Sequence, residues 1–74
     1  MKLREPYKGY IIEAMSLERS DGQGFVSDLF IENHGGEGVT VTQFGVPGTF
    51  STKELAIQNA VVSGRRKIDV GFAA

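Results

Sequence analysis

Histidine and cysteine, which supply many catalytic groups and metal ligands, are scarce in this chain. His34 is its one histidine, and it stands between Glu32 and Glu37 in the segment ENHGGEG. These side chains could supply a general base or a metal ligand, but a metal site needs three or four ligands supported by further contacts. Because glycine-rich polar segments are typical of turns, we interpret His34 as a solvated turn residue.

Other catalytic patterns are equally incomplete. The segment GGEG at 35–38 is followed by a predicted strand, whereas a phosphate-binding loop leads into a helix. A serine nucleophile would need His34 beside it, and a carboxylate pair such as Asp28 with Glu32 would need a cleft. With no cysteine in the chain, thiolate metal sites and thiol catalysis are also excluded. We therefore expect no enzyme activity, no cofactor and no metal.

The one basic run offers a different chemistry. Arg65, Arg66 and Lys67 follow Gly64, and Phe30 and Phe44 on an open sheet could stack with bases. Together these five side chains predict a site for single-stranded nucleic acid or another partner. The alternative is that the three cations complement a helix dipole and that the aromatics are core or dimer contacts. The net charge of −1 favours this alternative.

Length and composition indicate one small domain. The chain has 74 residues with 8 basic and 9 acidic side chains, and no apolar stretch of membrane-spanning length. The first ten residues lack the apolar run of a signal peptide, so we expect a cytoplasmic protein without membrane contact. A domain of this size is marginally stable, and oligomerisation is the compensation that remains without disulfides or a metal.

The pattern predicts an α+β fold of β-β-β-α order, a three-stranded antiparallel sheet followed by one helix. We expect strands at 7–17, 25–32 and 39–46, separated by glycine-rich turns at 21–24 and 33–38. Residues 1–6 end in Pro6 and are predicted to be a loose arm. Pro47-Gly48 predicts a type II turn, with an extra short strand at 48–50 or near the C-terminus left open.

The start of the helix carries a strong local signal. Ser51 and Glu54 have the spacing of a capping box, and Phe50 and Leu55 that of a hydrophobic staple. The helix is predicted over 52–67. One stripe at helical spacing faces the sheet and consists mostly of small residues: Ala56, Ile57, Ala60, Val61, Gly64 and Ile68. Gly64 indicates either a close backbone approach or the start of fraying.

One helix can cover only one face of a sheet. In the second strand we expect Phe25, Ser27, Leu29 and Ile31 to face it. The uncovered face would then expose some members of an apolar set: Ile11, Met15, Leu17, Val26, Phe30 and Phe44. Such a patch usually marks an interaction site, so we expect a homodimer through this face, with another protein partner as an alternative.

The last five residues, VGFAA, could pack back on the sheet through Val70 and Phe72 or form a short strand, and packing back is favoured because a small core benefits from every aromatic side chain. The alternative is a protruding apolar tail for a partner.

Three segments carry a resemblance to a known family: YKGYII at 7–12, FSTKE at 50–54 and GRRKID at 64–69. They resemble a family of small proteobacterial proteins of similar length whose function is not established. The resemblance spans most of the chain, although Leu55 stands where related sequences more often carry an acidic residue. It implies the three-strand-plus-helix arrangement and no particular activity. The matching positions are Tyr7, Gly9, Tyr10, Phe50, Thr52, Gly64, Arg65, Ile68 and Asp69.

Overall fold

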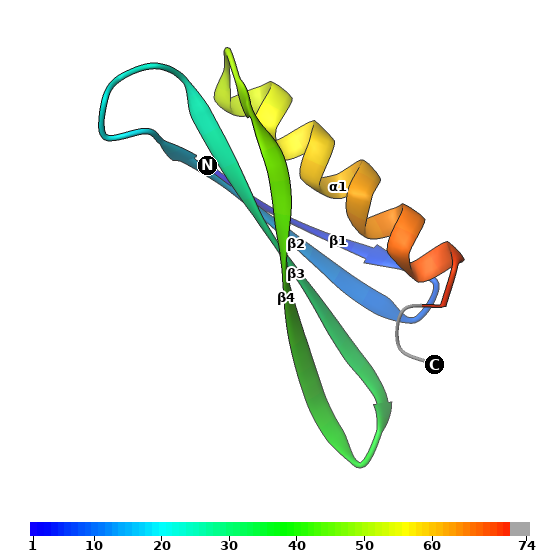
Figure 1. The fold of residues 1–74 in the computed structure, drawn as a ribbon. Helices are drawn as coiled ribbons and strands as arrows, with labels where there is room; N and C mark the ends of the chain where they lie inside the picture. Colours follow the sequence, from blue (N-terminus) through cyan, green and yellow to red (C-terminus); the bar gives the residue numbers. More distant parts are fainter. Residues whose placement is uncertain (72–74) are drawn as a thin grey trace.

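The protein is an α+β domain in which a four-stranded antiparallel open sheet precedes one helix that packs against it (Figure 1). The computed structural model describes residues 1–71. The strands lie in the order β1-β2-β3-β4, so each strand pairs with its neighbour in sequence. The elements are β1 (Lys2–Tyr7), β2 (Tyr10–Glu18), β3 (Phe25–Gly36), β4 (Gly38–Phe50) and α1 (Lys53–Asp69). The predicted α+β class, an antiparallel sheet followed by one C-terminal helix, is confirmed, but the predicted β-β-β-α order is wrong because the sheet has four strands.

The additional strand, β1, is the segment predicted to be a loose arm. It pairs with β2 from Lys2↔Met15 to Tyr7↔Tyr10, so the expected strand at 7–17 begins only at Tyr10. Lys8 and Gly9 form the two-residue turn between them, with φ of 49° and 85°. Two consecutive positive φ values are typical of a type I′ hairpin, whose twist matches that of the strands it joins. The turn was missed because lysine is an uncommon residue in its first position.

β4 is longer than predicted, because it continues through Pro47-Gly48 to Phe50. The predicted type II turn does not end the strand, and residues 48–50 belong to β4 itself. Two successive pairs, Ser27↔Val46 and Phe25↔Phe50, show a register shift that accommodates the extra residues of β4. Proline is tolerated here because β4 lies at the edge of the sheet and beside an irregularity.

The helix begins one residue later than its sequence signal predicted. Thr52 is the N-cap, and its Oγ1 accepts a hydrogen bond from the Leu55 N–H at 3.1 Å. The capping box of Ser51 with Glu54 is therefore wrong, as is the staple, because Phe50 does not occupy the position before the cap. α1 also continues past Gly64 to Asp69 instead of fraying there.

The core lies between α1 and the two central strands. All six residues of the predicted helix stripe are buried, which confirms the stripe. On the sheet, Ile12 and Ala14 of β2 and Leu29 and Ile31 of β3 are almost fully buried. The helix-facing set predicted for β3 is also confirmed, since Ser27 is buried and Phe25 is half-buried.

Gly64 lies where the helix and the sheet are in tight contact. A Cβ built on this glycine would lie 3.0 Å from Ile12 Cγ2 and 3.0 Å from Leu29 Cδ1. Both neighbours are fully buried and have little room to move. The predicted close backbone contact is thus confirmed, and it explains a glycine in the interior of a helix.

The chain end shows less than the sequence suggested. Val70 caps the helix and is 78% exposed, so it does not pack back on the sheet. The prediction for Phe72 lies outside the described residues.

Replacing Gly64 by alanine tests this contact. Helix propensity alone would stabilise the variant by about 1 kcal/mol. We expect overpacking against Ile12 and Leu29 to outweigh this gain and to lower the free energy of unfolding by about 1 kcal/mol or more, measured by urea denaturation. The control is Gln58→Ala on the exposed side of α1, which should change stability by less than about 0.5 kcal/mol because glutamine is already a good helix former. A Gly64→Ala protein more stable than wild type would contradict the tight contact.

Candidate interaction surface

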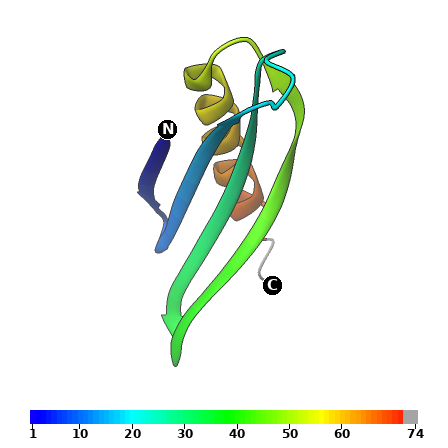
Figure 2. The same ribbon diagram turned by 90° about the vertical axis from the view of Figure 1, so that its left-hand side faces the viewer.

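The face of the sheet opposite α1 carries no covering element among residues 1–71 (Figure 2). Cross-strand partners in an antiparallel sheet share a face, so the register assigns its side chains. Because Ile12, Leu29 and Ile31 face the helix, their neighbours along the strands face away. We call this surface the open face; its members are Lys2, Arg4, Pro6, Ile11, Glu13, Met15, Leu17, Val26, Asp28, Phe30, Glu32, Val41, Gln43 and Gly45.

Five of the six apolar residues predicted for the uncovered face belong to it. Ile11, Met15, Val26 and Phe30 are half-buried among their neighbours, and Leu17 is 47% exposed. Phe44 was placed wrongly. It lies opposite Leu29 and packs on the core cluster under the helix, because its strand position has the parity of the helix-facing residues.

The apolar side chains of the open face form one stripe along β2 and β3. Leu17 lies directly opposite Val26, and Phe30 lies opposite Glu13 with Ile11 and Met15 on its diagonals. Diagonal neighbours on one face are about 7–8 Å apart at Cα, which aromatic and long side chains can bridge. The stripe is therefore continuous rather than a set of isolated exposed residues.

A row of charges crosses the open face beside this stripe. Arg4 Nη1 of β1 lies 2.7 Å from Glu13 of β2 and 2.7 Å from Glu32 of β3. Hydrogen bonds from Arg4 and, with a smaller effect, from His34 lower the pKa of Glu32. Glu32 and Glu13 in turn raise the pKa of Arg4. The row thus links three strands and favours the ionised form of Glu32.

His34 is part of this row and not of a turn. It is the tenth residue of β3, which continues to Gly36, and its side chain is exposed as predicted. Its Nε2 lies 3.0 Å from Glu32 Oε1. Within residues 1–71 no group of three or more histidine, aspartate or glutamate side chains could hold a metal ion.

The residues predicted for nucleic-acid contact do not form one surface. Phe30 is on the open face, whereas Phe44 and the basic run lie on the helix side. Arg65 is already bound by Glu5, with two N–O distances of 2.7 Å, and Glu5 raises its pKa. Lys67 Nζ lies 4.5 Å from the centre of the Phe44 ring, where a stacking base would have to sit. Nucleic-acid binding stays a prediction from sequence that this geometry does not favour.

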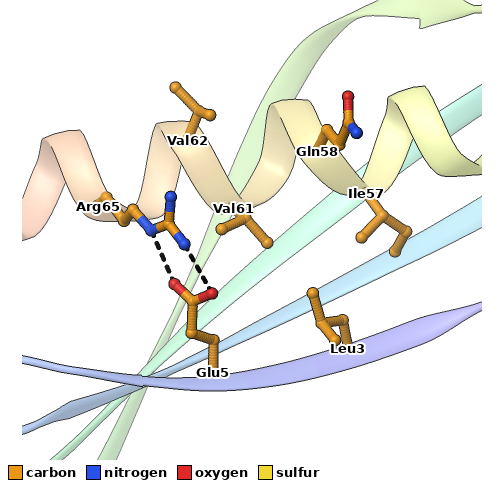
Figure 3. Close-up of a pocket in the computed structure, with 7 residues that line it drawn as sticks. All are labelled: Leu3, Glu5, Ile57, Gln58, Val61, Val62 and Arg65. Atoms are coloured by element: carbon orange, nitrogen blue, oxygen red, sulfur yellow. Dashed lines mark hydrogen bonds and ion pairs between the residues drawn. The ribbon is translucent and has the colours of Figure 1, made fainter.

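A shallow groove of about 310 Å³ lies between β1 and α1 (Figure 3). Leu3 points toward Ile57 and Val61 of the helix, and the Glu5–Arg65 ion pair closes one end. Sequence reasoning missed this groove because it treated residues 1–6 as an arm. Leu3 and Tyr7 lie at strand spacing on one face and are the signal that could have predicted a strand there, but the charged Glu5 between them interrupts the apolar alternation.

A second ionic contact joins the first hairpin to the end of the helix. Asp69 accepts hydrogen bonds from Lys8 Nζ at 2.6 Å and from the Tyr7 hydroxyl at 2.9 Å. The Lys8 bond, followed by the Tyr7 bond, lowers the pKa of Asp69, while Asp69 raises the pKa of Lys8. This contact holds the Lys8-Gly9 turn, which lies inside the segment 7–17 that was expected to be one continuous strand.

No protein-family model, curated protein or solved structure matches this chain. The family resemblance of the three segments accordingly stays a prediction. In the part of the chain that the structure describes, α1 lacks the length and apolar character that a membrane crossing requires.

The Asp69 contact predicts a specific acid dependence of stability. Since its pKa is lower in the folded state than the ordinary 3.8, its contribution is complete above that value and is lost as the pH falls through the folded pKa. We expect the free energy of unfolding to fall more gently with acid in Asp69→Asn than in wild type. The measurement is urea denaturation followed by circular dichroism at a series of pH values.

Glu37→Gln is the matched control for this series. Glu37 takes part in none of the ion pairs that the structure shows among residues 1–71, so its removal should leave the acid slope of wild type unchanged. Equal slopes for Asp69→Asn and wild type would contradict a role of this contact in stability.

Proposed function

We propose that this protein is a non-catalytic interaction module that self-associates through the open face of its sheet. The observation that carries the proposal is the continuous apolar stripe of Ile11, Met15, Leu17, Val26 and Phe30, which no element of residues 1–71 covers. An apolar stripe rimmed by polar residues is typical of a protein interface.

The surroundings of the stripe support a second copy as the partner. Arg4 and Lys2 lie among Glu13, Asp28 and Glu32, so both signs of charge are present on one face. A two-fold axis through the stripe would bring each face against an identical one, in which cations of one copy can approach carboxylates of the other. Two sheets that pack in this way lie about 10 Å apart with their side chains interdigitated.

Burial of this face in a dimer would also compensate for the small core of the domain. A chain of 74 residues has a small core, and here α1 covers only one side of the sheet. Dimerisation would give β2 and β3 a second apolar layer. Phe30 would be central to it, because large aromatic residues near the middle of an interface contribute most to binding.

The absence of catalysis is supported by the state of the polar groups. Glu5, Glu13, Glu32 and Asp69 are each engaged with a cation in the structure. The groove beside β1 is lined by apolar residues, Gln58 and the Glu5–Arg65 pair. Such a lining contains no nucleophile paired with a base, which acyl- or group-transfer chemistry requires.

Light scattering on a sizing column tests the proposal. We expect wild type to elute with twice the 8.0 kDa mass of one chain at high micromolar concentration, with little effect of salt, because the contact is mainly apolar. Phe30→Glu should weaken the dimer by about tenfold or more, since it would bury an unpaired carboxylate in the interface.

Leu55→Glu is the control, because Leu55 is exposed on the helix and away from the open face. It should leave the dimer intact, and circular dichroism should show that both variants are folded. A wild-type monomer at high micromolar concentration, or equal effects of the two substitutions, would refute self-association through this face.

A further inference from the structure

The two edges of the sheet differ in what their backbones present to solvent. Ser16 N–H donates to the Met1 carbonyl, and Arg19 N–H donates to the Gly24 carbonyl, both at 2.9 Å. These bonds extend the β1–β2 and β2–β3 ladders by one pair. Because hydrogen-bonded and non-hydrogen-bonded pairs alternate in antiparallel sheets, they fix which residues point their backbone groups inward throughout the sheet.

On β1 the even-numbered residues point outward, and all of them discourage pairing. Lys2 and Arg4 carry charge at the edge, and Pro6 has no N–H to donate. Charged residues and proline are the usual means by which a sheet edge avoids adding another strand. β1 is therefore a protected edge.

On β4 the opposite holds. Leu29↔Phe44 and Ile31↔Thr42 are hydrogen-bonded pairs, so the backbone groups of Phe44 and Thr42 point toward β3. The N–H and C=O groups of the alternate residues therefore point away from β3; these are Val39, Val41, Gln43 and Gly45. No residue from Gly38 to Phe50 is charged, and proline enters only at position 47. The segment VTVT is exposed and has strong β propensity.

The shape of the molecule leaves this edge accessible. The end of the β3–β4 hairpin extends beyond α1 and the β1–β2 turn in both views (Figures 1 and 2). Val41 is 57% exposed although it lies within a regular strand. An exposed edge that is this long and uncharged is a template for strand addition.

We propose that β4 pairs in antiparallel fashion with β4 of a second copy, joining the two sheets edge to edge. The outward positions are all odd-numbered, so an axis near Thr42 would match Val41 with Gln43 of the partner copy and Val39 with Gly45 of the partner copy. No like charges would meet across this axis, because the strand has none.

The self-match is why a second copy is the occupant rather than a foreign peptide. An antiparallel contact between two copies of one strand always matches outward parity and length, so charge is the deciding condition, and β4 has no charged residue that would repel its own copy. The result is one sheet of eight strands, four from each copy, with both helices on the same side. This contact is separate from the proposed open-face interface, and either can exist without the other.

Amide hydrogen exchange followed by NMR tests the pairing. In a monomer the amides of Val41 and Gln43 point to solvent and exchange rapidly, whereas those of Thr42 and Phe44 are protected by β3. The experiment uses the full chain carrying Phe30→Glu, which is expected to weaken the open-face contact. We expect the Val41 and Gln43 amides to exchange about tenfold or more slowly at millimolar than at low micromolar concentration.

Two further substitutions in that background make the test specific. Gln43→Pro removes an outward N–H and leaves the inward ladder intact, so Val41 should lose its protection while Thr42 keeps its own. Gln43→Val retains the N–H and should preserve protection. Thr42→Lys places like charges beside the axis on the helix side of the sheet, and it should weaken the pairing more at low salt than at high salt.

The outcomes separate the two proposals. Rapid, concentration-independent exchange at Val41 and Gln43 would overturn edge pairing, whether or not wild type is dimeric. Protection that appears only when another protein is added would assign the edge to a foreign strand and would also overturn it. If the Phe30→Glu protein shows protected Val41 and Gln43 amides and has the same mass in solution as wild type, the edge contact is supported and the open-face interface is refuted.

Discussion

The close contact between α1 and the two central strands is the constraint on which the rest of the structure depends. Ala56, Ala60 and Gly64 recur at four-residue intervals, so the helix presents a surface of small residues to the sheet. Ile12 and Leu29 fill the space that this surface leaves, and a Cβ at Gly64 would lie only 3.0 Å from both of them. Interiors are packed closely enough that one methyl group is felt, so this contact fixes the position of the helix.

That position determines which surfaces of the sheet stay uncovered. A single helix can serve only one face, and the opposite face keeps an apolar stripe beside a row of charges centred on Arg4. The Glu5–Arg65 and Lys8–Asp69 pairs tie β1 and its turn to the end of the helix. Such exposed pairs contribute little energy individually, but they join β1 and its turn to α1 at several points. The functional proposals concern the face and the edge that this arrangement leaves open.

Turn chemistry explains where the chain departs from its simplest interpretation. Lys8 and Gly9 both adopt positive φ and reverse the chain inside a segment whose pattern reads as one strand. Pro47 and Gly48 have a turn-like sequence, yet β4 passes through them because an edge strand tolerates a shift in register. The weaker local turn signal therefore formed a turn and the stronger one did not, and the pairing with neighbouring strands decided between them.

The helix stripe from Ala56 to Ile68 and the helix-facing set of β3 were determined by the sequence itself, because side-chain periodicity of 3.6 or 2 residues follows from local geometry alone. The same rule predicted the face on which most of the apolar residues of the open face lie. The pairing of residues 1–6 and the side on which Phe44 lies were decided by the tertiary structure. Each depends on register or on a neighbour distant in sequence, and a one-residue change in register moves a side chain to the other face.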